Sequence, residues 1–352
     1  MGKPFVSVLI DTYNHERFIE EAIVSVIEQD FPASDREILV VDDGSTDRTP
    51  EIVHKFEPHV RLLRKQNGGQ ASAFNAGIPE CKGEVIAFLD GDDWWELQKL
   101  TRVVEAFAED ASLGIVGHGI INVQRDGREQ IESLRENFRF QANTIEGAQL
   151  FRRRGAFLGT SRMAIRAGLL QRIGPVPARI EIQADEYLFT LATALAGARI
   201  LPEALTYYRL HEANSFILPT HDHQKLRRKQ KSLEILAKRL LEKLEQFGVE
   251  RPVRRAVVEY TQAGADQLRL ALDGGWPWET ARTEWKIYRV VHPDAPLSHR
   301  VFKVAVLLGA LVVPPKLFYR LQRALAQSVL YRRARSRWLP VPEMQHIQRN
   351  YR

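Results

Sequence analysis

The sequence predicts an α/β fold, in which a mostly parallel sheet is flanked by helices and followed by a helical C-terminal region. Short apolar runs rich in β-branched residues alternate with stretches of helical periodicity through residues 5–100. Each run passes directly into a polar loop, and several of these loops contain Asp. Beyond residue 215 only helical periodicity remains. The chain therefore changes from alternating strands and helices to helices alone.

The first hundred residues have the order of a repeated strand–helix–strand unit. Successive strands joined by helices form a parallel sheet with helices on both faces. Pro50 suits the first turn of the second helix. The expected strands cover 5–10, 37–41, 60–63 and the run that ends at Asp90, and the expected helices cover 19–27, 49–56 and 71–77.

The middle of the chain continues this pattern less regularly. We expect a helix near 100–107, a strand at 114–123, a polar hairpin-like segment at 124–131, and a strand and helix that end near Leu170. Further helices are expected at 226–247, 253–272 and 276–291, which indicates a bundle appended to the sheet domain. The expected domains are a catalytic domain at 1–215, a helical bundle region at 216–300, and a basic amphipathic tail at 301–352.

Composition limits the cellular setting. The single cysteine, Cys81, excludes an intramolecular disulfide and favours a reducing compartment. The first residues lack the pattern of a signal peptide, since the apolar run at 5–10 is short and is followed by Asp11. We therefore expect a cytoplasmic location.

The positive charge is concentrated at the C-terminal end. The net charge is +6, yet residues 301–352 hold ten Lys and Arg and only one acidic residue, Glu343. The uncharged run at 304–313 is half the roughly 20 residues that span a bilayer, so we expect an interfacial helix or a buried core helix. Apolar and aromatic residues among clustered Arg suit an anionic membrane surface. This predicts peripheral association with the cytoplasmic face of a membrane; a solvated or oligomer-facing tail is the alternative.

Three acidic residues follow the strand that ends at Asp90. Asp90, Asp92 and Asp93 stand within four positions, and their mutual repulsion is costly unless a cation lies among them. Hard oxygen ligands suit Mg²⁺ or Mn²⁺, and a metal with few protein ligands keeps positions for substrate phosphates. A solvated acidic turn is the alternative. Two further strand ends carry Asp11 with Tyr13, and Asp42 with Asp43, at the edge where such sheets bind ligands.

Four motifs give the chain a specific resemblance. They are VLIDTYN at 8–14, VVDDGSTD at 40–47, NGG with Asn75 and Gly77 at 67–77, and FLDGDD at 88–93. Their order and spacing resemble family 2 glycosyltransferases of the GT-A (Rossmann-like) fold over residues 5–100, with further matches to about 215. Asp11 departs from the family, which usually has a small residue or Pro there, and it adds a carboxylate near the nucleotide.

The resemblance implies a nucleotide site at the strand ends. Tyr13 would stack on the base, although a half-buried loop aromatic is the alternative. Asp43 would accept a hydrogen bond from a base N–H, and Asp42 would support the loop. The metal ligands would be Asp92 and Asp90. The implied nucleotide-binding residues are Thr12, Tyr13, Asp43, Gly68, Gly69, Asn75, Asp90 and Gly91, of which Asn75 has helix packing as its alternative.

The resemblance also implies a catalytic base in the stretch 183–189. Asp185 keeps the expected position, although Ala184 replaces the usual first acid, and Glu186 is the runner-up. The alternative is a plain helix cap, since carboxylates are favoured at helix N-termini. Candidates for acceptor or diphosphate contacts are Asp93, Trp94, Arg209 and His211, with burial in the core or a structural loop role as the alternatives.

Together these features predict an inverting transferase that moves a sugar from a nucleoside diphosphate sugar to a hydroxyl of a glycan or lipid-linked acceptor, in cell-surface polysaccharide synthesis. UDP is the first guess for the nucleotide. A non-catalytic nucleotide-sugar-binding scaffold is the first alternative, because the acidic pair at 184–186 is altered. A metal-dependent nucleotidyltransferase is the second. Nucleic acid is not an expected partner, because three carboxylate-rich strand ends would repel its phosphates.

Overall fold

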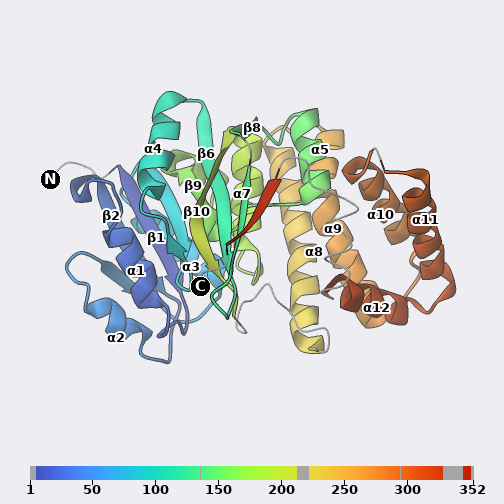
Figure 1. The fold of residues 1–352 in the computed structure, drawn as a ribbon, viewed down its shortest axis with the longest axis horizontal. Helices are drawn as coiled ribbons and strands as arrows, with labels where there is room; N and C mark the ends of the chain where they lie inside the picture. Colours follow the sequence, from blue (N-terminus) through green and yellow to red (C-terminus); the bar gives the residue numbers. More distant parts are fainter. Residues whose placement is uncertain (1–4, 135, 212–221, 294, 328–343, 350–352) are drawn as a thin grey trace. The chain divides into compact units, whose positions relative to one another are not determined.

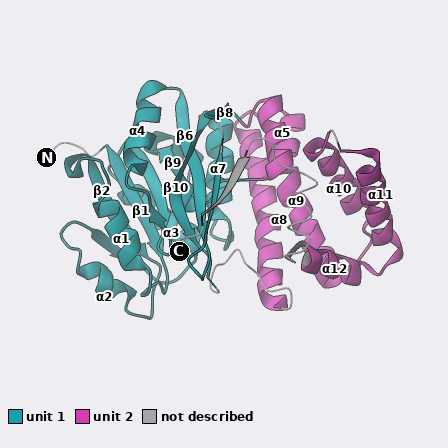
Figure 2. Cartoon of the chain, viewed as in Figure 1, with its two compact units in different colours: residues 1–141, 156–214, 343–352 teal, residues 142–155, 215–342 magenta. Residues whose placement is uncertain are grey.

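The computed structural model contains two compact units (Figure 2). The first comprises residues 1–141, 156–214 and 343–352, and the second comprises residues 142–155 and 215–342. The residues that the structure describes are 5–134, 136–211, 222–293, 295–327 and 344–349.

The first unit is built on a parallel sheet. Strand β1 (Val6–Thr12) pairs in parallel with β2 (Arg36–Asp42) on one side and β4 (Val85–Asp90) on the other, and β3 (Arg61–Arg64) extends β2. This is the order expected from the alternating pattern, and the α/β fold class is confirmed. In Figure 1 these strands and the short helices between them are drawn in blue tones.

The remaining strands make the sheet mixed. Strand β9 (Met163–Arg166) pairs antiparallel with both β4 and β6 (Leu113–Val123), and β10 (Gly197–Arg209) runs parallel to β6. The hairpin-like segment of the sequence is the turn between β6 and β7 (Glu129–Leu134). Shorter strands are β5 (Trp94–Trp95) and β8 (Phe138–Phe140) against β10, and β11 (Met344–Arg349) against β7.

Helices cover both faces of the sheet. One face is buried by α1 (Ile19–Ile27), α2 (Thr49–His54) and α4 (Lys99–Glu109), whose apolar residues join Val6, Val8 and Ile10 of β1 in one core. On the other face α3 (Gln70–Gly77) packs closely, since a Cβ at Gly77 would lie 2.7 Å from side-chain atoms of Leu9 and Val41. Helices α6 (Ala167–Ile173) and α7 (Ala184–Leu195) complete the unit.

The register of the sheet brings the acidic strand ends together. Asp11 of β1 is the direct partner of Asp90 of β4, and Thr12 is the partner of Asp42 of β2. Because neighbouring parallel strands end at the same edge, their loops open on one side of the sheet. The carboxylates that the sequence spreads over eighty residues therefore meet at one edge.

The second unit is helical. It consists of α5 (Ile145–Arg154), α8 (His223–Gln246), α9 (Arg251–Asp273), α10 (Trp278–Val291), α11 (Leu297–Val312) and α12 (Pro315–Gln327). Helix α9 packs against four of the others, α5, α8, α10 and α12. The expected domain boundary at 215 did not anticipate α5, which belongs to this unit. The proposed tail at 301–352 is also divided, since α11 and α12 belong here, β11 belongs to the first unit, and 328–343 and 350–352 lie outside the described residues.

None of the helices that the structure describes is long and apolar enough to cross a membrane. Nearly all of the uncharged run at 304–313 lies in α11, where Leu307 and Ala310 are buried and Leu308, which is also apolar, is exposed.

Candidate active site

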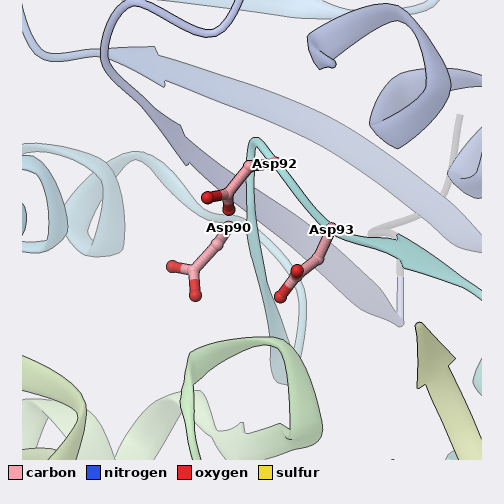
Figure 3. Close-up of side chains that lie close together, drawn as sticks. All are labelled: Asp90, Asp92 and Asp93. Atoms are coloured by element: carbon pink, nitrogen blue, oxygen red, sulfur yellow. The ribbon is translucent and has the colours of Figure 1, made fainter. Parts of the chain in front are cut away.

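Three carboxylates form a compact cluster where β4 ends. Asp90, Asp92 and Asp93 each offer an oxygen, and these oxygens lie within 4.8 Å of one another. Figure 3 shows the three side chains, with Asp90 at the end of β4 and Asp92 and Asp93 on the turn that follows it. Gly91 allows this turn to approach β1, because a Cβ there would lie 2.6 Å from Thr12 Oγ1 and 2.9 Å from His15 Nδ1.

Ser161 holds the cluster from the side of β9. Its hydroxyl donates to Asp93 Oδ2 at 2.6 Å and accepts a hydrogen bond from the backbone N–H of Asp90 at 3.1 Å. The other oxygen of Asp93 accepts from the backbone N–H of Arg209 at 3.1 Å. Asp93 is buried and both of its oxygens accept a hydrogen bond, so it supports the junction between the turn after β4 and β10.

The electrostatics of the cluster favour a bound cation. Burial, followed by the charges of neighbouring Asp residues, raises the pKa of both Asp90 and Asp93 well above its usual range. These shifts mean that the negative charges are poorly compensated by the protein alone. Closely spaced carboxylate oxygens fit Mg²⁺ or Mn²⁺, both of which prefer oxygen ligands.

Asp92 differs from its neighbours because two histidines face it. His211 Nε2 lies 2.8 Å from Asp92 Oδ2, and His15 Nε2 lies 3.9 Å from the same oxygen. Burial alone would raise the pKa of Asp92, but the hydrogen bond from His211 and the charges of His15 and His211 lower it overall. Asp92 is therefore the member of the cluster most readily ionised.

Asp11 adds a fourth carboxylate beside the cluster. Its Oδ1 atom is buried without a hydrogen-bond partner. Burial, followed by the charge of Asp92, raises the pKa of Asp11 to about 7. Nearby, Gln70 Nε2 donates to both Asp90 Oδ1 and Thr160 Oγ1, each at 3.0 Å, and so links α3 to the segment before β9.

The loops after β1 and β2 contain the residues expected to hold a nucleotide. Tyr13 is 44% exposed, so its ring is open for stacking. Asp43 is buried and accepts hydrogen bonds from the backbone N–H groups of Gly68 and Gly69 and from Lys65 Nζ, the last at 2.6 Å. Asp43 thus fixes the glycine loop in place. A contact between Asp43 and a base N–H would add to these bonds.

Three other predicted residues make contacts that define their local roles. Asp42 accepts from Ser45 N–H and from Arg64 Nε, which is the loop support expected of it. The Asn75 side-chain amide pairs with both backbone groups of Val176, at 2.7 and 2.8 Å. Asn75 therefore anchors the segment around 176, and its implied place in the nucleotide site stays a prediction. Thr12 Oγ1 lies 3.2 Å from His15 Nδ1 and orients that ring.

Asp185 opens α7 and lies at the same edge of the sheet. It is half-buried and accepts hydrogen bonds from the backbone N–H groups of Glu186, at 2.9 Å, and Thr160. Burial raises the pKa of Asp185 to about 6, and its charge contributes to the raised pKa of Asp90. By contrast, Glu186 is buried and receives a hydrogen bond from Gln183 Nε2 at 2.8 Å. Asp185 is the better placed of the two to exchange a proton.

The two remaining candidates form a stacked group. The Trp94 ring is parallel to that of Tyr207, with 4.9 Å between centroids, and the Arg209 guanidinium lies 4.3 Å from the Trp94 centroid. Arg209 Nε also donates to the backbone oxygen of Asp92, and its Nη2 pairs with Glu21. These contacts cover the Trp94 ring with protein groups, which favours the structural alternative over an acceptor contact for this side chain. The neighbouring Trp95 is buried.

Several residues at this site escaped the sequence analysis. Lys99 is fully buried and donates to Ser161 O at 2.7 Å, beneath the cluster. Burial lowers the pKa of Lys99 well below its usual range. A lysine on an otherwise amphipathic helix gives no signal of burial, and Ser161 and Gln70 are ordinary polar residues in sequence. His15 alone could have been found, since it follows Tyr13 in the first strand-end loop.

The geometry defines a GT-A-type α/β domain with a carboxylate metal site at its strand ends. Residues 7–173 match the model of glycosyl transferase family 2, which confirms the resemblance carried by the four motifs. An uncharacterized glycosyltransferase of Nostoc sp. is 33% identical over 217 residues, which cover 60% of this chain and 66% of the relative. The match therefore spans just under two thirds of that relative's length.

Solved structures support the fold. TarS of S. aureus in complex with UDP-GlcNAc superposes with a TM-score of 0.54 at 19% identity, covering 87% of this chain and 91% of that chain. A mannosyltransferase from Pyrobaculum calidifontis in complex with GDP-Man and Mn²⁺ gives a TM-score of 0.53 at 19% identity, covering 96% and 88%. At these identities the likeness establishes the GT-A fold.

Proposed function

We propose that the chain is an inverting glycosyltransferase that uses a nucleoside diphosphate sugar and a divalent metal, Mn²⁺ or Mg²⁺. The observation that carries this proposal is that a half-buried carboxylate with a raised pKa, Asp185, shares one edge of the sheet with the Asp90–Asp92 cluster. One group is suited to take a proton and the other to hold a metal. We assign catalysis to residues 1–215.

In the proposed reaction Asp185 accepts the proton of an acceptor hydroxyl while that oxygen attacks the anomeric carbon of the sugar. The new C–O bond forms on the side of the anomeric carbon opposite the diphosphate. The bond to the diphosphate breaks and the diphosphate leaves with the electron pair, so the configuration inverts. A metal held by Asp92 and Asp90, with His211 beside them, would neutralise charge on the departing diphosphate. The half-buried position of Asp185 keeps its pKa high enough for proton uptake.

The donor is proposed to be a UDP-sugar. TarS, whose name describes a poly(ribitol-phosphate) β-N-acetylglucosaminyltransferase, is solved with UDP and with UDP-GlcNAc. Asp43 beside the glycine loop and the exposed ring of Tyr13 offer the hydrogen bond and the stacking surface that a uracil base requires. The mannosyltransferase complex with GDP-Man makes a guanine nucleotide the competing choice.

The acceptor is proposed to be a hydroxyl of a glycan or lipid-linked glycan in cell-surface polysaccharide synthesis. The name of TarS, which specifies the polymer poly(ribitol-phosphate), supports a polymeric acceptor. Such an acceptor would place the enzyme on the cytoplasmic face of a membrane as a peripheral protein.

A comparison of two adjacent acids tests the proposal. Asp185→Asn should abolish sugar transfer and UDP-sugar hydrolysis while the Mn²⁺-dependent thermal shift with UDP is kept, because ligand that binds the native state stabilises it by mass action. Glu186→Gln is the matched control and should retain activity. Full transfer by Asp185→Asn would contradict the assignment. A wild-type protein that binds UDP but never cleaves any UDP-sugar would favour the non-catalytic scaffold.

A panel of UDP, GDP, dTDP and CMP, each with Mn²⁺, Mg²⁺ or EDTA, identifies the donor class. An increase in Tm that occurs with one nucleotide and is abolished by EDTA supports the metal–diphosphate site. Absence of any shift would contradict it.

A further inference from the structure

Two helices of the second unit carry apolar stripes on their exposed faces. On α11 the stripe repeats at helical spacing, and on α12 it follows every fourth residue. Leu297 and Val312, at the two ends of α11, are 77% and 85% exposed. The stripe residues are Leu297, Val301, Val304, Leu308 and Val312 on α11, and Leu317, Leu321 and Leu325 on α12, all exposed.

The opposite faces of these helices are already packed. Leu307 and Ala310 of α11 are buried, and Tyr319 of α12 is 1% exposed in a cluster with Leu270 and Ala271 of α9. The exposed stripes are therefore additional to what the bundle needs for its own packing.

Basic residues accompany the stripes, and acidic residues do not. The segment 297–327 contains no Asp or Glu. Lys316 and Arg320 are exposed and, by helical periodicity, flank the Leu317–Leu321 stripe on one side. Long basic side chains beside an apolar stripe can lay their stems along an interface with their charges in the headgroup layer. The basic residues of the segment are Arg300, Lys303, Lys316, Arg320 and Arg323. Of these, Lys303 already pairs with Glu284 of α10 at 3.1 Å.

We infer that the α11–α12 face, defined by these two stripes together with Lys316 and Arg320, docks on an anionic phospholipid surface. The apolar stripes enter the boundary between headgroups and acyl chains, and the basic residues contact lipid phosphates. A bilayer surface is the occupant that uses both features, because a purely apolar protein groove would desolvate the charges of Lys316 and Arg320 without supplying a negative charge. Neither helix is long and apolar enough to span the bilayer, so docking is in the plane of the surface.

This inference deepens the proposed function, on which it rests for its biological setting, since a lipid-linked acceptor lies at such a surface. Its measurement is independent of sugar transfer. Lipid binding by a protein without transferase activity would uphold the docking face and contradict the proposed function. The reverse result would uphold the function and contradict the docking face.

The test is co-sedimentation of the full chain with vesicles of phosphatidylcholine, with or without phosphatidylglycerol. We expect binding that requires phosphatidylglycerol and weakens with added salt. Lys316→Gln should reduce the partition coefficient about fivefold, which corresponds to roughly 1 kcal/mol per basic residue near the surface. The double variant Leu308→Glu with Leu321→Glu should abolish binding, because both positions lie in the stripes.

The matched control is Ile145→Glu, which places the same charge at an exposed apolar residue of α5 in the same unit. It should bind vesicles like the wild type, and all variants should keep the thermal shift with UDP that reports the folded first unit. Failure of the wild-type protein to bind anionic vesicles would overturn the inference, as would normal binding by the double variant. A wild-type dimer that the double variant disrupts, without lipid binding, would assign the face to a second copy instead.

Discussion

His211 Nε2 lies 2.8 Å from Asp92 Oδ2, although 119 residues separate the two in sequence. The contact joins the end of β10 to the turn after β4. It is reinforced by the Phe18 ring, which lies 4.9 Å from the imidazole of His211. The histidine therefore belongs to the carboxylate cluster, where it holds Asp92 ionised.

Replacing His211 with Gln should weaken Mn²⁺-dependent UDP binding about tenfold or more, since a hydrogen bond to a charged group contributes about 1.5–3 kcal/mol. The measurement is a titration of Mn²⁺ at fixed UDP, followed by thermal shift. His54→Gln removes a histidine paired with Glu57 on the surface and serves as the control. Identical Mn²⁺ titrations for the His211 variant and the wild type would contradict a role of His211 in metal-dependent UDP binding.

The pKa of Asp185 predicts how activity depends on pH. A general base must be deprotonated, and burial raises the pKa of this group to about 6. We expect kcat/KM to fall about tenfold per pH unit below about pH 6. Glu186→Gln should keep the same profile, whereas a profile that moves in that variant would assign the titration to Glu186. Nucleotide binding, measured in parallel, separates loss of chemistry from loss of donor affinity.

Asp11 should lower the stability of the metal-free protein at alkaline pH. Its pKa is raised from 3.8 to about 7, so the folded chain binds this proton more tightly than the unfolded chain. The proton stabilises the fold fully below pH 3.8, the pKa in the unfolded chain. This stabilisation is lost as pH rises through about 7, the pKa in the folded chain. In EDTA, Asp11→Asn should therefore raise Tm at about pH 8 and leave it nearly unchanged at about pH 4.

Asp35→Asn, at an exposed position, is the control for Asp11. A Tm increase for Asp11→Asn that is equal at both pH values would contradict the buried-charge explanation. With Mn²⁺ present the advantage of the Asn variant should shrink or reverse, because the cation and the carboxylate then attract each other. The metal titration thus measures whether the charge of Asp11 interacts with the bound cation.

The sequence predicts the strands and the cluster because both are local. An apolar run followed by Asp90, Asp92 and Asp93 specifies a strand and its end within a dozen residues. The meeting of Asp11 with Asp90 follows from parallel pairing, which the alternation of strands and helices already implies. The fold class can therefore be predicted from the sequence alone.

Contacts that join distant segments could not be predicted from local sequence patterns. Helix α5 has the same local pattern whether it packs on the sheet or on α9, and only tertiary packing places it in the helical unit. Lys99 is buried because the Ser161 carbonyl and the Trp95 ring, 3.4 Å from its Nζ, receive it. Tyr319 faces inward because α9 offers an apolar surface there. Each depends on a partner that periodicity does not identify.

Glu259 should be a main determinant of stability in the helical unit. Its carboxylate lies 2.6 Å from Arg152 Nε of α5 and 2.6 Å from Lys286 Nζ of α10, and its side chain is 15% exposed. Glu259→Gln leaves two cations without their counter-charge, so we expect a loss of about 1–3 kcal/mol in the free energy of unfolding of this unit. Hydrogen exchange of peptides from α5, α9 and α10 measures the loss directly.

The matched control is Glu242→Gln in α8, which breaks an exposed pair with Arg239 at 2.8 Å. Exposed pairs contribute little, and we expect less than about 0.5 kcal/mol there. The UDP-dependent thermal shift should be unchanged in both variants, because the nucleotide residues lie in the first unit. Equal protection losses for the two variants would show that the Arg152–Glu259–Lys286 network behaves as a surface pair and that apolar packing alone holds α5 to the bundle.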